Sequence, residues 1–201
     1  MEKRKRRNKS WLIIGSLFFL IGISLISYDY LSNKKQDYEE EQALSNFYEV
    51  EEQEEQEETE VKKEVKEQVK INYIAVLKIP KISLERGLVD PNSYLNNVDY
   101  NLEFIKGTSM PDEEKGNVII AGHSGTARIS YFRNLDKLVL DDKIELLYKN
   151  ITYVYRVVDI YDIEKTGKAR IIRNTDKNTI TLITCRYGTN KQIIIIGELI
   201  E

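Results

Sequence analysis

The chain has 201 residues, of which 41% are hydrophobic and 31% charged, and it contains one cysteine and one histidine. This length favours one globular domain with appendages. A single cysteine excludes an internal disulfide framework and a multi-cysteine zinc site, and a single histidine argues against a histidine-rich catalytic metal centre.

The small net charge of −3 conceals three regions of very different charge. Residues 1–10 carry six Lys or Arg against one Glu, whereas residues 28–70 carry six Lys against fifteen acidic residues. Residues 71–201 are nearly neutral, with eighteen basic and seventeen acidic residues. We therefore expect three parts with three roles. Because the basic cluster lies beside an apolar segment, anionic lipid is its expected partner, and nucleic-acid binding is not expected.

The segment from Trp11 to Tyr28 contains no charged residue and is predicted to be a transmembrane helix. At about 1.5 Å per residue it reaches roughly 27 Å, enough to cross a hydrocarbon core. A cleaved signal peptide is the alternative, but the apolar run is longer than a typical signal core and no small-residue cleavage site follows it. The positive-inside rule predicts a single-pass protein with a cytoplasmic tail at 1–10 and everything after Tyr28 outside the cell membrane.

Residues 29–70 are predicted to be an acidic stalk. Their high density of like charge and their few large apolar residues disfavour a compact fold. A solvated helix is the alternative, since Glu and Lys are good helix formers. In either form the segment would hold the next domain away from the membrane.

From residue 71 onward the sequence is typical of short β-strands, because Ile, Val, Thr and Tyr dominate runs that end in turn-forming residues. One short helix is expected over residues 130–138, where Phe132, Leu135 and Leu138 have helical spacing. The fold class is therefore all-β: a closed β-barrel of about eight strands with one or two short helices. The strands are expected at 71–79, 116–122, 143–148, 151–161, 178–184 and 192–200.

Cys185 and His123 each follow an apolar strand, at a point where the chain enters a loop. Rigid strands commonly hold reactive groups at such a rim, where substrates can reach them. Each residue by itself has a structural alternative, a small buried thiol or a hydrogen-bonded rim histidine. Together they favour nucleophilic catalysis, since a thiol needs a neighbouring base and His123 is the only imidazole in the chain.

At this point the residues resemble the sortase family. TLITC (181–185) is similar to the sortase cysteine signature, and GNVIIAGHSG (116–125) is similar to the segment that holds the sortase histidine. The blocks IPKISLERGLV (79–89), IKGTSMPDEEKGN (105–117) and YFRNLDKL (131–138) also resemble sortases. The resemblance covers about residues 71–201, which are thereby expected to be an extracellular catalytic domain.

The resemblance implies a membrane-anchored cysteine transpeptidase of the thiol-peptidase class. Such enzymes recognise an LPXTG-like sorting motif near the C-terminus of secreted proteins, and the acyl group passes through a thioester to an amine such as a peptidoglycan precursor. By match, Cys185 would be the nucleophile and His123 the residue that protonates the leaving amine and deprotonates the incoming one.

The sequence departs from the family at the arginine that sortases carry at the start of the last strand. Gln192 stands at that position, with Lys191 beside it. A glutamine amide can donate a hydrogen bond to an oxyanion, although without the charge assistance of an arginine. Arg186, directly after the cysteine, is a second candidate for the missing charge. An ordinary edge-strand role for Gln192 is the alternative.

Thr184 and Ser124 are further candidates for substrate binding, with strand packing and a turn as their respective alternatives. No cofactor is expected. Asp112, Glu113 and Glu114 could hold Ca²⁺, as a loop does in some sortases, but their spacing is not that of an EF-hand and favours a solvated turn.

Two other functions remain open from the sequence. One is a hydrolytic cysteine peptidase of the same fold, and the other is a non-catalytic binding barrel tethered to the membrane, which the missing arginine would favour. A chain that ends at Glu201, directly after the last expected strand, argues against a sortase with a C-terminal anchor and leaves general surface-protein anchoring as the expected task.

Overall fold

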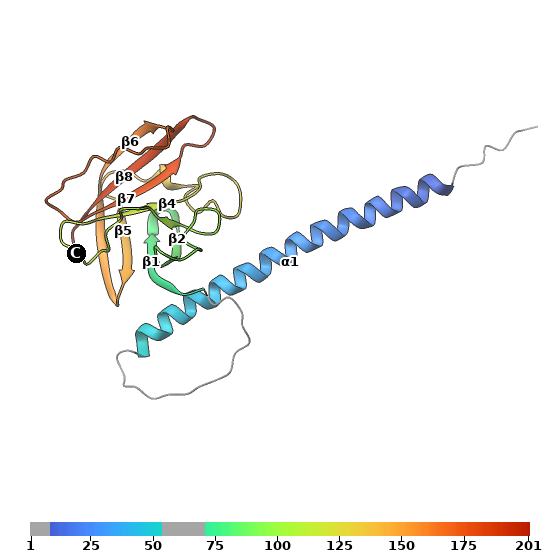
Figure 1. Ribbon diagram of the computed structural model, residues 1–201, viewed down its shortest axis with the longest axis horizontal. Helices are drawn as coiled ribbons and strands as arrows, with labels where there is room; N and C mark the ends of the chain where they lie inside the picture. Colours follow the sequence, from blue (N-terminus) through green and yellow to red (C-terminus); the bar gives the residue numbers. More distant parts are fainter. Residues whose placement is uncertain (1–8, 54–70) are drawn as a thin grey trace, which may run out of the picture. The chain divides into compact units, whose positions relative to one another are not determined.

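The computed structural model describes residues 9–53 and 71–201 (Figure 1). The chain divides into two compact units, the first ending at Gln42 and the second comprising Ala43–Glu201. Most of the predicted basic tail and the last part of the predicted stalk, residues 54–70, lie outside the described residues.

The predicted membrane segment forms part of a longer helix, α1 (Lys9–Gln53). Large apolar side chains are exposed along it, among them Phe18, Leu25 and Ile26. Among the described residues this is the one helix that is long and apolar enough to cross a membrane. The first half of the predicted stalk, through Gln53, continues the same helix, because Glu, Lys and Gln favour helix and pairs such as Lys35–Glu39 join successive turns.

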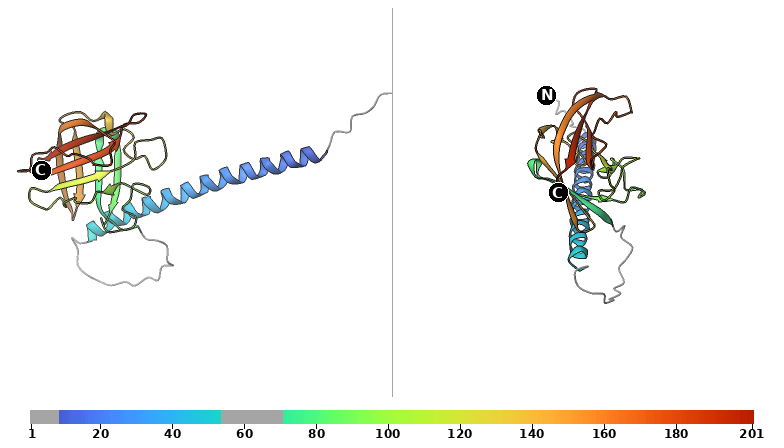
Figure 2. Two further views of the ribbon diagram at one scale, coloured as in Figure 1. Left: turned by 45° about the horizontal axis from the view of Figure 1, so that its top comes forward. Right: turned by 90° about the vertical axis from the view of Figure 1, so that its left-hand side faces the viewer.

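The second unit is built on one eight-stranded sheet, with the order β2-β1-β5-β6-β8-β7-β4-β3. Figures 1 and 2 show this sheet curling round on itself into a nearly closed barrel. The strands are β1 (Tyr73–Ile79), β2 (Leu84–Val89), β3 (Glu103–Phe104), β4 (Asn117–Ala121), β5 (Lys143–Tyr148), β6 (Ile151–Glu164), β7 (Thr179–Cys185) and β8 (Lys191–Leu199).

The predicted all-β barrel is confirmed, and each of the six expected strands is present within a few residues of its expected ends. β2 and β3, the two outermost strands of the sheet, were not among the strands expected from the sequence. The expected helix over 130–138 is reduced to a single 3₁₀ turn, Leu135–Lys137, and a second such turn covers Pro80–Ile82. Three-residue spacing suits a 3₁₀ turn, in which residues i and i+3 lie on one side, so Phe132, Leu135 and Leu138 are still buried.

The core lies inside the barrel, and alternation along β7 shows which side chains reach it. Ile180 and Leu182 belong to the main apolar cluster, whereas Ile183 belongs to a second cluster on the outer face of the sheet. The same alternation holds in β8, where Ile193 and Ile195 face inward and Ile194 faces outward.

The end of α1 belongs to the same compact unit as the barrel. Ala43, Leu44 and Phe47 form an apolar cluster with four other residues of the second unit: Ile71 just before β1, Tyr73 on β1, Val89 on β2 and Leu95 in the loop after β2. The Tyr48 hydroxyl donates a hydrogen bond of 2.6 Å to Oε1 of Glu85, and the Lys78 ammonium lies 5.0 Å from the centre of the Tyr48 ring. The last turns of α1 are therefore part of the folded domain.

Candidate active site

Cys185 is the last residue of β7 and is half-buried. β-branched residues dominate this strand, TITLITC, and favour its extended conformation. Because alternate residues of a strand share a face, Cys185 projects from the same outer face as Ile183. The thiol therefore lies at the rim of the barrel, on the outer face of the sheet.

His123 lies two residues beyond β4, which runs parallel to β7 with Ala121 opposite Ile183. The segments after this pair remain hydrogen-bonded to each other. The Gly122 amide donates to the Ile183 carbonyl at 3.2 Å, and the Thr184 hydroxyl donates to the Gly122 carbonyl at 2.7 Å. His123 follows Gly122 directly and Cys185 follows Thr184 directly, so the two residues come next along these neighbouring segments.

Gly122 makes this approach possible. A Cβ atom at this position would lie 2.5 Å from a methyl carbon of Leu102 and 3.0 Å from the ring of Phe132, two fully buried side chains. The His123 carbonyl also accepts a hydrogen bond of 3.0 Å from the Phe132 amide. The backbone on both sides of the imidazole is therefore fixed by the core.

Gln192 is the cross-strand partner of Cys185 in the antiparallel pair of β7 and β8. The Arg186 amide donates to the Lys191 carbonyl at 2.9 Å, so Cys185 and Gln192 form the next pair, which is not hydrogen-bonded. Side chains of such pairs lie closest together, with Cα atoms about 4.5 Å apart. The register therefore places Cys185 and Gln192 side by side on one face of the sheet, and His123 comes two residues after the end of the neighbouring strand β4.

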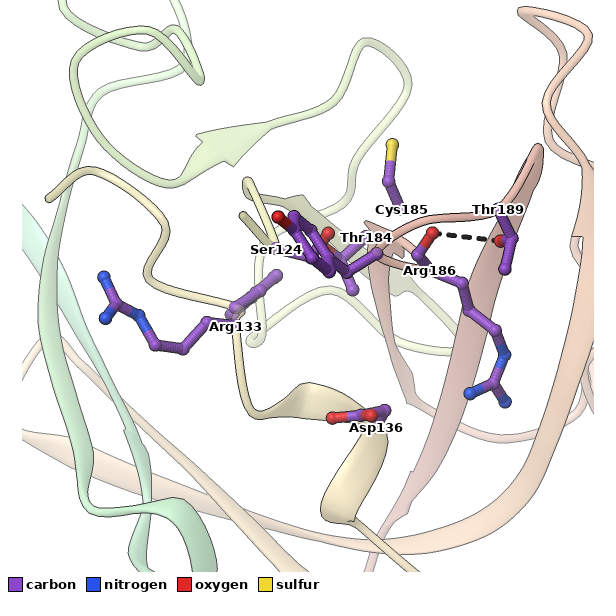
Figure 3. A pocket seen from close by; sticks show the side chains of 9 residues that line it. Ser124, Arg133, Asp136, Thr184, Cys185, Arg186 and Thr189 are labelled. Carbon is purple, nitrogen blue, oxygen red and sulfur yellow. Dashed lines mark hydrogen bonds between the residues drawn. The ribbon is translucent and has the colours of Figure 1, made fainter. Parts of the chain in front are cut away.

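Arg186 is directed elsewhere. Its Nε donates a hydrogen bond of 2.6 Å to Oδ1 of Asp162 on β6. Figure 3 shows its guanidinium pointing away from the Cys185 sulfur, while its carbonyl accepts a hydrogen bond from Thr189. The structure thus places this second candidate for the missing charge in an ion pair beside the site.

A cavity of about 260 Å³ adjoins the thiol. It is lined by Ser124, Phe132, Arg133, Asp136, Thr184, Cys185, Arg186, Tyr187 and Thr189 (Figure 3). Both predicted substrate-binding residues, Ser124 and Thr184, are among them, but the Thr184 hydroxyl donates to the Gly122 carbonyl, which uses its proton. Arg133 donates to the carbonyls of Ala127 and Ser130, which hold it at one side of the cavity.

The sequence reading missed Asp99. Its Oδ1 lies 3.5 Å from Nε2 of His123, and it comes from the loop between β2 and β3. Asp99 is 24 residues before the histidine in a polar segment without periodicity, so no pattern in the sequence links the two.

Residues 77–200 match the family model of the sortase domain. The chain belongs to the sortase family. It is 25% identical over 210 residues to sortase A of Bacillus anthracis, with 96% of each chain covered. It is 33% identical over 117 residues to sortase A of Listeria monocytogenes, covering 51% of this chain and 52% of that relative.

Solved structures agree with this assignment. A sortase D5 transpeptidase of Clostridium perfringens is 25% identical and superposes with a TM-score of 0.58, covering 83% of this chain and 98% of that one. Sortase C1 of Streptococcus agalactiae is 27% identical with a TM-score of 0.56, covering 64% and 68%. Because sortases are cysteine transpeptidases, this sortase is one by family, with Cys185 as its only thiol.

Two of the three residues considered for Ca²⁺ binding, Asp112 and Glu113, have other partners. Asp112 pairs with Lys149 at 2.9 Å, and Oε1 of Glu113 accepts a hydrogen bond from the Met110 amide. Within residues 9–53 and 71–201 no group of three or more His, Cys, Asp or Glu side chains is placed to hold a metal ion. That the protein needs no cofactor stays a prediction.

Proposed function

We propose that this sortase cleaves an LPXTG-like sorting motif in secreted proteins and transfers the acyl group to a surface amine such as a peptidoglycan precursor. One observation supports this most: Gln192 is the cross-strand partner of Cys185, and His123 follows the end of β4, the strand that runs parallel to β7. Nucleophile, acid–base group and oxyanion donor are the parts that acyl transfer requires.

In the first step the Cys185 sulfur attacks the carbonyl carbon of the motif's Thr, and a C–S bond forms. The carbonyl oxygen becomes an oxyanion, to which the Gln192 amide donates a hydrogen bond. The C–N bond then breaks as His123 gives its proton to the departing amine. In the second step the acceptor amine attacks the thioester, its proton passes to His123, and the thiolate leaves.

The proposed setting is the outer surface of the cell membrane. The apolar part of α1 would anchor the chain, with the basic residues at 1–10 in the cytoplasm and the barrel outside. This orientation places the barrel where secreted proteins and cell-wall amines are found, and it needs no nucleic-acid partner.

The test is mass spectrometry of the full chain in detergent micelles, incubated with a small set of LPXTG-like peptides. We expect an acyl adduct on Cys185 that a glycine peptide releases as a new amide, with no adduct in Cys185→Ser or His123→Ala. Release of the adduct by water alone would instead indicate a hydrolytic peptidase. Absence of any adduct with every peptide, together with slow alkylation of Cys185, would contradict the proposal and support a binding barrel.

A further inference from the structure

We infer that Asp99 is a positioning residue for His123, holding the imidazole in the orientation and tautomer that proton transfer requires. The inference rests on the proposed acyl transfer at Cys185 and adds a member to its machinery. It is carried by the contact between Oδ1 of Asp99 and Nε2 of His123, 3.5 Å apart.

This contact joins two exposed side chains, so the inference requires that something restrict their conformations. The His123 side chain is 43% exposed and that of Asp99 is 74% exposed. An imidazole so open to water has several rotamers available unless a partner selects one. A long contact before substrate binds is compatible with a catalytic arrangement, since such hydrogen bonds often tighten in the complex.

The loop that carries Asp99 is firmly attached to the barrel through Asn101. The Asn101 side chain is buried and donates a hydrogen bond of 2.8 Å to the Gly87 carbonyl. Its Oδ1 accepts one of 3.2 Å from Nε of Arg86, and the same guanidinium donates at 2.7 Å to the Tyr131 hydroxyl and lies 3.9 Å from the centre of that ring. The anchor is two residues from the carboxylate.

The backbone at Asp99 itself is also fixed. Its amide donates to Oδ1 of Asn97 at 2.9 Å, and the Tyr100 amide donates to the Asn97 carbonyl at 3.0 Å. This is a hydrogen-bonded Asx turn, which holds a local conformation without secondary structure. Among the described residues, the Asp99 carboxylate contacts the His123 imidazole.

The chemistry follows from which nitrogen Asp99 contacts. A carboxylate accepts but does not donate, so Nε2 keeps its proton in both charge states of the ring. The exchanging proton is then the one on Nδ1, which goes to the departing amine in the first step and returns from the acceptor amine in the second.

The test compares Asp99→Asn and Asp99→Glu in the full chain in detergent, using LPXTG-like peptides and a glycine acceptor. We expect Asp99→Asn to lower kcat by about 3- to 10-fold with KM unchanged, since exposed ion pairs are weak, and Asp99→Glu to recover most of the loss. Asp90→Asn removes the same charge from the same loop and keeps an acceptor oxygen for Asn92, so it should change kcat less than about twofold.

A second readout does not depend on the peptide. Alkylation of Cys185 by iodoacetamide should be several-fold slower in Asp99→Asn than in the parent chain, because an imidazole that Asp99 no longer orients is a poorer base for the thiol. If no peptide is cleaved but alkylation slows, the proposed substrate is wrong and the role of Asp99 stands. Unchanged kcat and unchanged alkylation, or a rise in KM alone, would overturn the inference.

Discussion

The two faces of β4, β7 and β8 are built from the same kind of residue but serve different purposes. Inward-facing side chains such as Ile120, Leu182 and Ile195 fill the main core of the barrel. Outward-facing ones, Ile119, Ile183 and Ile194, form a second cluster against which Ile171, from the segment between β6 and β7, packs. The outer row of β7 and β8 continues to Cys185 and Gln192, so one face stabilises the fold and the other leads to the candidate reactive groups.

The most direct test of this difference between the two faces is to truncate one side chain on each face of β7. Leu182→Ala should lower the free energy of unfolding by about 2–5 kcal/mol, because Leu182 is fully buried inside the barrel. Its KM for the sorting peptide should stay unchanged at temperatures where the variant is folded. Near-UV circular dichroism of the thirteen tyrosines during denaturant titration measures the loss.

Ile183→Ala is the matched control on the outer face. It removes a side chain of similar size one residue away, and we expect a smaller loss of stability together with a higher KM, since Ile183 lies beside Cys185 on its face. Equal effects of the two substitutions on KM would show that the faces are not separate in function.

Substitution of Gln192 tests whether the outer face contributes to the chemical step. Gln192→Ala should lower kcat by about 10- to 100-fold because the oxyanion loses a donor, and Gln192→Arg should equal or exceed the parent because a charged donor is stronger. Lys191→Ala tests the neighbouring cation, with an expected change below about twofold. A larger loss in Lys191→Ala than in Gln192→Ala would move the oxyanion role to the lysine. Single-turnover acylation kinetics make the measurement.

Local patterns were enough to predict the barrel and to select His123 and Cys185 as candidates for the site. The strands of the sheet interior are runs of β-branched and aromatic residues with clear ends, so six of them could be located from composition alone. β3 has two residues, too few for any periodicity, and β2 (LERGLV) is interrupted by charge and glycine. Edge strands like these are defined by their pairing partners, which the sequence does not display.

The positions of site residues relative to one another required the register. That the strand before His123 lies beside the strand that ends at Cys185 follows from a parallel pairing of β4 with β7, which joins segments about sixty residues apart. Arg186 could not be placed from the sequence, because its direction depends on Asp162 of a third strand. Asp99 reaches the histidine through a loop whose shape comes from tertiary hydrogen bonds to Gly87 and Arg86.

On the inner face, Tyr155 is the residue to test next, because its hydroxyl places a polar atom in the core. The side chain is fully buried on β6, and among the described residues its hydroxyl has no hydrogen-bond partner. Burial raises the pKa of this phenol well above its usual value near 10. The neutral form is thus favoured in the fold, and this contribution to stability is complete below about pH 10 and is lost as the pH rises further.

Tyr155→Phe should therefore leave the free energy of unfolding at pH 7 within about 1 kcal/mol of the parent, or raise it slightly, because no hydrogen bond is lost. It should also reduce the fall in stability above about pH 10. Denaturant titrations at pH 7 and pH 10.5 provide the measurement. A loss of more than about 2 kcal/mol at pH 7 would indicate a hidden partner for the hydroxyl, such as a buried water.

The ion pair of Arg186 and Asp162 is expected to have the smallest effect, because the outer face needs it neither for the core nor for the chemical step. Its two side chains are 35% and 31% exposed, so a double-mutant cycle with Arg186→Ala and Asp162→Ala should give a coupling of about 0.2–1 kcal/mol in stability. Since the guanidinium points away from the thiol, kcat should fall less than about threefold in Arg186→Ala (Figure 3). A loss as large as that of Gln192→Ala would mean that Arg186 leaves Asp162 during the reaction and supplies the positive charge that Gln192 lacks.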